Sequence, residues 1–204
     1  MLTLVIAEAA LERVPASICD HPLIIKSARK RGKPPEKMLL DSNFHHTAMQ
    51  SLRDAPKRGR PDILHIILLC ALESVTNRQG NLSTYIHTRN DEIITINPRT
   101  RIPRSYNRFC GLMEQLLETG CAANLLHMEK KSLFGFLSNL PGQKIVLDYK
   151  GNPLNLQKDV ICIVGGFPHG DFENALPYPR MQVIGNPLPA WTVVNELLVR
   201  YEFL

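Results

Sequence analysis

Short apolar runs alternate with longer amphipathic segments along this chain, and that alternation is typical of an α/β protein. Four runs are largely apolar and end in glycine, proline or a polar turn: residues 2–7, 145–149, 160–164 and 183–185. Such runs predict buried strands of a mostly parallel sheet. Residues 81–88 and 92–96 are expected to be two further strands, joined by a short turn at residues 89–91.

Segments with apolar residues three and four positions apart predict the helices. The expected helices span residues 8–14, 21–31, 43–52, 62–73, 105–120 and 190–201. Helix 62–73 is apolar almost all round and should be buried, with Pro61 in its first turn. Ser105 is the expected N-cap of helix 105–120, and Gly120 suits the position just past its end.

The charge of the chain is moderately positive, and the positive residues are clustered. Lysine and arginine number 24 against 19 acidic residues, which gives a net charge of +5 over 204 residues. Basic runs lie at residues 26–37, 57–60 and 99–108, whereas residues 160–204 are close to neutral. A clustered excess of this kind indicates a nucleic-acid partner, while an evenly spread one would not.

The cysteines and the N-terminus predict a cytoplasmic protein. The five cysteines are an odd number, are widely spaced and form no C-x-x-C, so we expect reduced thiols without a disulfide framework or a metal site. The first residues lack the basic start and long apolar run of a signal peptide. No stretch is apolar over the length needed to cross a membrane, so a membrane partner is not expected.

Residues 97–109, NPRTRIPRSYNRF, form the most informative basic segment. Arginines stand at positions 99, 101, 104 and 108. Pro98 and Pro103 favour an extended loop in the first half, and the helical pattern begins only after Pro103. Guanidinium groups on a rigid loop at the positive end of a helix are well suited to bind phosphate. The alternative from these residues alone is a solvated basic loop whose arginines pair with nearby acids.

Two other basic segments carry weaker predictions. In residues 55–62, APKRGRPD, we expect an ion pair between Arg60 and Asp62, with Lys57 and Arg58 pointing outward. Residues 29–37, RKRGKPPEK, are expected to form a loop that is either solvated or ordered only when RNA binds.

Residues 164–172, VGGFPHGDF, and residues 184–191, IGNPLPAW, lie at the expected ends of strands. The glycine pattern is neither G-x-G-x-x-G nor a P-loop, so it does not indicate a nucleotide by motif. Strand ends with tight loops are the usual ligand site of an open α/β sheet. A ligand site and a simple turn both remain open at this point.

Over nearly its full length the chain resembles the ribosome-biogenesis pseudouridine N1-methyltransferases of archaea and eukaryotes, which belong to the SPOUT class. The matching segments are AEAALE (7–12), RKRGKPP (29–35), LLDSNFHHTAM (39–49), KRGRPDILH (57–65), YIHT (85–88), NPRTRIPRSYNRFCGLMEQLL (97–117), VGGFPHGDF (164–172) and IGNPLPAWTVVNELL (184–198). The arginine segment is the most specific of these. The eukaryotic members carry N-terminal extensions that this chain does not match, so an archaeal form is expected.

The resemblance implies a fold, a cofactor and an oligomeric state. The fold would be a single SPOUT-type α/β knot over residues 1–204, a parallel sheet with a C-terminal trefoil knot. A β-hairpin and arginine-loop insertion around residues 77–109 would bind RNA. The cofactor would be S-adenosyl-L-methionine, held by Leu147, Gly165, Gly170, Ile184, Gly185, Asn186, Pro187, Leu188, Pro189 and Ala190. The family forms homodimers through the knotted region.

The implied activity is methylation of N1 of a pseudouridine in small-subunit (16S) rRNA during ribosome biogenesis, with ribosomal assembly proteins as further partners. The RNA-binding residues implied by the resemblance are Arg60, Asp62, Arg101, Arg104 and Arg108. Asp62 is also the candidate catalytic base, with an orienting ion pair to Arg60 as the alternative. Two other functions remain: a non-catalytic RNA-binding assembly factor, and an enzyme that methylates a ribose 2′-OH or another base nitrogen.

Overall fold

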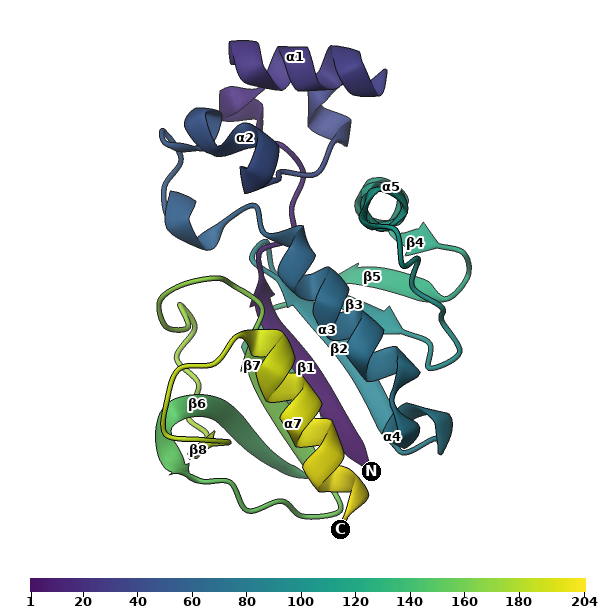
Figure 1. The fold of residues 1–204 in the computed structure, drawn as a ribbon, viewed down its shortest axis with the longest axis vertical. Helices are drawn as coiled ribbons and strands as arrows, with labels where there is room; N and C mark the ends of the chain where they lie inside the picture. Colours follow the sequence, from purple (N-terminus) through teal and green to yellow (C-terminus); the bar gives the residue numbers. More distant parts are fainter.

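Strand β1 (Leu2–Ala9) lies in the middle of an eight-stranded sheet, as the computed structural model of all 204 residues shows (Figure 1). The other strands are β2 (Leu82–Thr88), β3 (Glu92–Ile96), β4 (Cys121–Ala122), β5 (Leu126–Lys130), β6 (Gln143–Pro153), β7 (Val160–Gly165) and β8 (Arg180–Gln182). Their order across the sheet is β4-β5-β3-β2-β1-β7-β6-β8.

The sheet combines a parallel part with an antiparallel extension. Strands β2, β1, β7, β6 and β8 pair in parallel, which confirms the predicted parallel sheet for that part. The predicted hairpin is also present, because β2 pairs antiparallel with β3. Strands β5 and β4 continue the antiparallel pairing beyond β3. The hairpin therefore extends the central sheet at the edge that leads into the arginine segment.

Alternate residues of β1 point into two different hydrophobic cores. Leu4 and Ile6 belong to a large cluster on one face, whereas Val5 and Ala7 belong to a smaller cluster on the other. Because β1 is covered on both faces, it is a continuous apolar run rather than an alternating one. The smaller cluster is closed by helix α6 (Leu133–Ser138).

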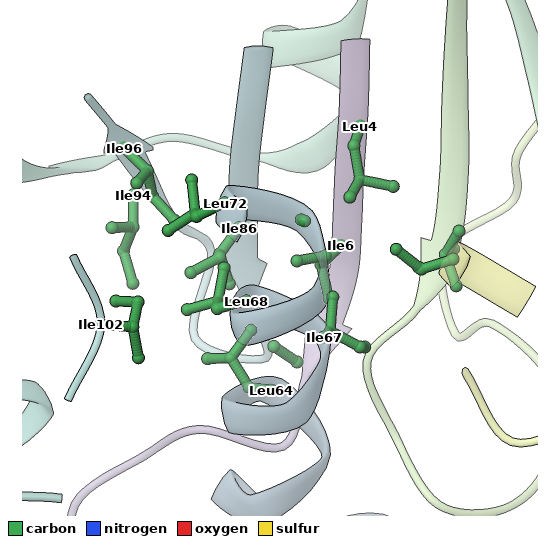
Figure 2. Close-up of a cluster of buried hydrophobic side chains, with 14 of the residues drawn as sticks. Leu4, Ile6, Leu64, Ile67, Leu68, Leu72, Ile86, Ile94, Ile96 and Ile102 are labelled. Carbon is green, nitrogen blue, oxygen red and sulfur yellow. The ribbon is translucent and has the colours of Figure 1, made fainter. Parts of the chain in front are cut away.

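The large core packs helices α3 (Pro61–Glu73), α5 (Tyr106–Thr119) and α7 (Ala190–Glu202) against the sheet. Figure 2 shows side chains of α3 inserted among those of the central strands. Burial of both sides of α3 explains its apolar sequence. A short helix, α4 (Val75–Arg78), follows α3. No helix combines the length and the apolar character needed to cross a membrane.

A small helical lobe stands at one end of the sheet (Figure 1). It contains α1 (Pro22–Arg31) and α2 (Ser42–Met49), with short 3₁₀ turns at Ala16–Ile18, Pro35–Lys37 and Ala55–Lys57. The lobe has its own core, in which Ile24, Met38 and Leu40 are fully buried. It is thereby held as a unit above the end of β1.

The predicted helix over residues 8–14 is wrong. Glu8 and Ala9 continue β1, and residues 10–14 form no helix. Glu8 adopts a left-handed backbone with φ of 52°, and the carboxylates of Glu8 and Glu12 are bound by distant segments. Tertiary contacts of these buried acids override the local helix propensity.

Two other differences concern the C-terminal half. The predicted strand at residues 183–185 is displaced, since β8 ends at Gln182 and the following residues form a loop. Strands β4 and β5 and helix α6 had no counterpart in the prediction. These elements have only two, five and six residues, which is too few to show a period.

Candidate functional site

A cavity of about 740 Å³ opens at the end of β7 and beside residues 147–150 of β6, where the loops before β8 and α7 pass over the sheet. The residues predicted to hold the cofactor line it, with the exception of Gly185, which lies in the same loop outside the lining: Leu147, Gly165, Gly170, Ile184, Asn186, Pro187, Leu188, Pro189 and Ala190. A volume of this size is typical of sites for small molecules. Chain segments far apart in sequence therefore meet around one space.

The glycine-rich loop after β7 is shaped by close contacts. A side chain at Gly166 would lie 2.8 Å from the Cα atom of Ala9, because the loop crosses the end of β1 there. Gly170 has a φ of 87°, a conformation that favours glycine. The backbone of Gly166 also exchanges hydrogen bonds with Ala7 and Ala10. The glycines thus allow this loop to follow the sheet closely while its backbone faces the cavity.

The lining of the cavity is mixed in character. Apolar groups such as Leu147, Ile184 and Trp191 offer flat contact area, and the loop backbones offer hydrogen-bond partners. Asp148 lies in the wall and forms an ion pair with Arg180, which also binds Asp171. The pKa of Arg180 is raised by its hydrogen bonds to these carboxylates. Charged groups are thereby available beside apolar ones.

The arginine segment is held rigidly rather than hanging free. The Nε2 atom of His65, on α3, lies 2.8 Å from the carbonyl oxygen of Pro103, so the imidazole donates this bond. The Nδ2 atom of Asn77 donates to the carbonyl of Pro98 at 2.9 Å. The ring of Phe109 is fully buried and stacks on His65 at 4.5 Å. The loop and the start of α5 are therefore fixed to α3.

Helix α5 is also fixed to the helical lobe. The hydroxyl of Tyr106 donates to Asp41, at the start of α2, at 2.6 Å. Burial raises the pKa of Tyr106, and this hydrogen bond raises it further.

The two ends of α5 agree with the prediction in position. Ser105 stands at the N-cap position, but its side chain makes no capping hydrogen bond. Helix α5 ends at Gly120, whose φ is 74°.

The predicted ion pair between Arg60 and Asp62 is confirmed, and it is bidentate. Both donor–acceptor distances are 2.8 Å, and the hydrogen bond to Asp62 is the first cause of the raised pKa of Arg60. The carbonyl oxygen of Gly59, next to Arg60 in the chain, accepts a hydrogen bond from the N–H of Ser42 at 2.8 Å, and Ser42 follows Asp41, the partner of Tyr106. Arg60 also lines the cavity. The segment of Gly59 and Arg60 therefore connects the cavity with the start of α5.

The remaining predicted RNA-binding arginines are exposed. Arg101 and Arg108 form no ion pair, and Arg104 approaches the exposed Glu73 only at 3.6 Å. Ion pairs between such exposed groups contribute little, so these guanidiniums can turn to another partner. The alternative predicted pairing with nearby acids, which Arg101 and Arg108 lack, while their exposure fits a solvated loop as well as a phosphate-binding one.

The other basic segments are less exposed than predicted. Arg58 points inward, where its guanidinium binds the buried carboxylate of Glu12 at 2.6 and 2.8 Å. Lys57 also points inward, and its Nζ atom lies 2.5 Å from the carbonyl oxygen of Asp171. The expectation that both side chains point outward was wrong, because Arg58 binds a buried carboxylate and Lys57 binds the loop that carries Asp171.

The predicted basic loop of residues 29–37 is neither wholly solvated nor disordered. Helix α1 continues to Arg31 and ends at Gly32. Arg31 and Lys33 both pair with Glu114, a residue of α5 that is only 3% exposed. These ion pairs attach the segment to α5, the helix that carries Arg108.

Several side chains of the cavity were missed by reasoning from sequence. Phe167 and Phe172 lie in its wall and meet edge to face at 5.3 Å. Asp148 and Tyr149 line it from β6. Both phenylalanines lie in the glycine-rich segment 164–172, and two aromatic residues in such a loop were a signal for a binding wall. Nothing in the sequence near β6 indicates a role for Asp148 or Tyr149.

Comparison with known protein families gives one consistent result. The sequence model of the EMG1/NEP1 methyltransferase family matches residues 4–202. The chain is 47% identical to the ribosomal RNA small subunit methyltransferase Nep1 of Thermococcus onnurineus, over 99% of this chain and 98% of that protein. It is 45% identical to the protein of the same name from Pyrococcus furiosus, over 99% and 96% of the two chains.

A solved structure agrees with these sequence matches. The fold is similar to the crystal structure of Archaeoglobus fulgidus Nep1 bound to S-adenosylhomocysteine, with a TM-score of 0.91 and 37% identity. The similarity covers 98% of this chain and 97% of the other.

Proposed function

The chain belongs to the EMG1/NEP1 methyltransferase family, and from this we propose that it transfers a methyl group from S-adenosyl-L-methionine to N1 of a pseudouridine in small-subunit rRNA. The observation that carries the proposal is the position of Arg60. Its side chain lines the cavity, and the adjacent Gly59 binds the segment of Asp41, which holds Tyr106 at the start of α5. Arg104 and Arg108, which flank Tyr106 in the sequence, are exposed. A methyl donor and an RNA strand would therefore meet at this residue.

The cavity suits the cofactor by its chemistry. Backbone groups of residues 184–190 and the glycine loop would hold the adenosine, with Leu147 and Ile184 packing against it. When bound, S-adenosyl-L-methionine supplies a methyl group already activated by the sulfonium charge. The protein then contributes mainly position and electrostatics rather than a nucleophile of its own. The prolines at 187 and 189 stiffen this wall before any ligand binds.

The exposed arginines suit a single strand of RNA whose target base is turned out of its stack. Pseudouridine is joined to its ribose through carbon, so its N1 carries a proton that uridine lacks at that position. To reach a methyl donor in the cavity the base must be unstacked, and a loop of rRNA makes this least costly. Arg101, Arg104 and Arg108 would hold the neighbouring phosphates by charge-assisted hydrogen bonds.

The proposal is tested by methyl transfer to a short rRNA hairpin that carries either pseudouridine or uridine at one loop position. We expect incorporation of labelled methyl into the pseudouridine hairpin only, since uridine offers no N1–H. Calorimetric titration with the cofactor should show binding in the absence of RNA. RNA binding without cofactor binding or incorporation would contradict the proposal and would favour an assembly factor without catalysis.

Asp62 is proposed to orient Arg60 rather than to act as the catalytic base, because both of its oxygens are already bound by that guanidinium. In Asp62→Asn we expect RNA affinity to fall about tenfold as Arg60 loses its charged partner. Single-turnover methyl transfer at saturating RNA should stay within about tenfold of wild type, whereas loss of a general base would cost about 100-fold or more.

Glu73→Gln is the matched control for Asp62→Asn. It removes the carboxylate near Arg104, but both side chains of that pair are exposed at a distance of 3.6 Å. We expect RNA affinity and methyl transfer close to wild type in this variant. If Asp62→Asn is folded and its methyl-transfer rate falls by about 100-fold or more, Asp62 is the catalytic base.

The proposal includes a single domain with a C-terminal trefoil knot, in which residues around 77–109 serve as an RNA-binding insertion. It also includes a homodimer formed through the C-terminal region. Exposed apolar residues near the cavity and the C-terminus support such an interface: Ile184, Val199, Phe203 and Leu204. Ribosomal assembly proteins are proposed as further partners because the product is rRNA of the small subunit.

A further inference from the structure

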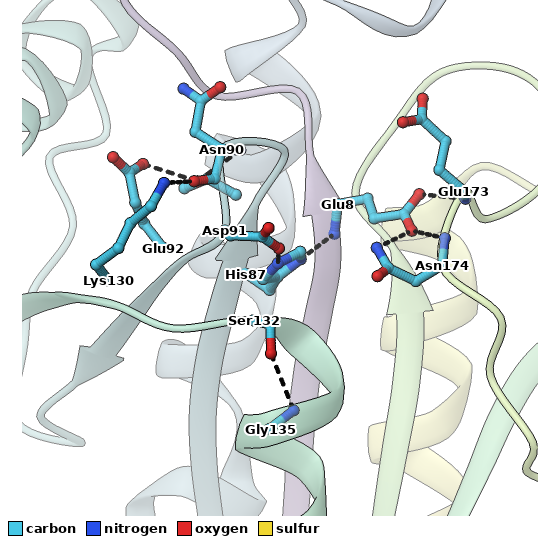
Figure 3. A network of polar contacts seen from close by, with 11 residues as sticks. Glu8, His87, Asn90, Asp91, Glu92, Lys130, Ser132, Gly135, Glu173 and Asn174 are labelled. Atoms are coloured by element: carbon cyan, nitrogen blue, oxygen red, sulfur yellow. Dashed lines mark hydrogen bonds and ion pairs between the residues drawn. The ribbon is translucent and has the colours of Figure 1, made fainter.

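The loop of residues 165–174, which follows β7 and is here called the cofactor loop, forms one wall of the cavity. Its far end is bound by Glu8, as Figure 3 shows. The carboxylate of Glu8 accepts hydrogen bonds from the backbone N–H groups of Glu173 at 2.8 Å and Asn174 at 2.7 Å. The N–H of Glu8 in turn donates to His87 at 3.2 Å. The end of β1 thus fixes this end of the loop.

The middle of the cofactor loop is bound by a different residue, Lys57. Its Nζ atom donates to the carbonyl oxygen of Asp171 at 2.5 Å and lies 3.6 Å from a carboxylate oxygen of Glu173. The same ammonium lies 5.1 Å from the centre of the Phe167 ring. A Cβ atom at Gly170 would be only 2.9 Å from Cε of Lys57. One side chain therefore contacts the loop along most of its length.

Lys57 does not belong to the sheet that carries the loop. It lies in the segment that leads into α3, and the same segment carries Arg60 at the edge of the cavity. Arg58, between them, is anchored on Glu12 by two hydrogen bonds. The segment is therefore fixed at its centre, with Lys57 directed to the cofactor loop and Arg60 at the cavity.

We propose that Lys57 is a positioning residue for the cofactor loop, which it holds in its binding shape and joins to the segment that carries Arg60. This inference rests on the proposed function. A loop that is ordered before the ligand arrives loses less conformational entropy on binding, so removal of the ammonium should weaken cofactor binding. It should leave Arg101, Arg104 and Arg108 unchanged, because Lys57 contacts none of them.

Lys57→Met tests the proposal because it keeps the length of the side chain and removes the charge. Titration of the whole protein with S-adenosylhomocysteine should give an affinity about tenfold lower than that of wild type, as expected for one lost charge-assisted hydrogen bond. The KM for S-adenosyl-L-methionine should rise by about the same factor, with kcat within about twofold. Lys57→Arg should restore most of the affinity, since its guanidinium can donate to the same carbonyl.

Lys37→Met is the matched control, because Lys37 is also paired with an acid, Glu118, but lies away from the cavity. It should bind S-adenosylhomocysteine like wild type. Equal affinity of Lys57→Met and wild type would overturn the proposal. Weaker binding of the RNA hairpin alone, with unchanged binding of S-adenosylhomocysteine, would also overturn it by making Lys57 a phosphate contact.

The outcome for wild type is separate from this comparison. If wild type binds S-adenosylhomocysteine but does not methylate the pseudouridine hairpin, the proposed reaction fails while the role of Lys57 in the loop is still decided by the ratio of affinities. If wild type binds no S-adenosylhomocysteine, the proposed function and the role of Lys57 fail together.

Discussion

Replacement of Arg101, Arg104 and Arg108 together by alanine is expected to weaken binding of the rRNA hairpin by about 100-fold or more at physiological salt. The three side chains are exposed on a loop and helix start that α3 holds in place, so they can meet phosphates without rearrangement. The dependence of log affinity on log salt should become shallower by about 2, as expected for three lost contacts to single-stranded RNA. Binding of S-adenosylhomocysteine should not change.

A second triple variant separates a specific surface from a general charge effect. Arg53, Lys130 and Lys158 are exposed and lie outside residues 77–109, so their replacement by alanine removes the same charge elsewhere. We expect this variant to lose less than about tenfold in RNA affinity, because only long-range attraction changes. Equal losses in the two triple variants would contradict a dedicated RNA surface on the loop and α5.

Phe109→Ala is expected to lower the free energy of unfolding by about 3–5 kcal/mol. The ring is fully buried and stacks on His65, which in turn donates to Pro103 in the arginine loop. Its removal leaves a cavity between α5 and α3 that the fixed helices cannot fill. Urea unfolding measures the change, and RNA affinity should also fall because the start of α5 is no longer held in one position.

Phe134→Ala is the control for this core substitution. Phe134 is 56% exposed on α6, so its loss should change the free energy of unfolding by at most about 1 kcal/mol. If both substitutions lower the free energy of unfolding equally, the contact between α5 and α3 is not a main source of stability. Reduced RNA affinity in Phe134→Ala alone would place the RNA surface elsewhere on the molecule.

The spacing of apolar residues predicted the long helices and the hairpin well, because nearby residues determine where each begins and ends. Helix α3 is a continuous apolar segment that begins with Pro61, and its burial follows directly from that composition. Helix α5 begins after Pro103 and ends at Gly120, where the backbone turns left-handed. The β2–β3 hairpin was visible as two runs joined by a short polar turn. In each case the residues that decide the structure are close in sequence.

The segment of residues 8–14 shows where such reasoning fails. Its acids look like the polar face of a helix, but Glu8 and Glu12 are 7% and 4% exposed. Their partners, Asn174 and Arg58, are remote in sequence. The free energy of satisfying buried carboxylates outweighs the small helix preference of a short segment. No pattern within the segment could reveal this.

The candidate site divides in the same way. The arginines, the ion pair of Arg60 with Asp62, and the loops at the strand ends were recognisable in the sequence, because their residue types and spacing carry the chemistry. Only the tertiary structure decided that Arg60 reaches the cavity, that Arg58 turns inward, and that Lys57 binds the cofactor loop. The sequence by itself thus determined which groups are available and which elements carry them. These groups come together because parallel strands and crossing loops bring distant segments to one place. That arrangement depends on the packing of the whole chain.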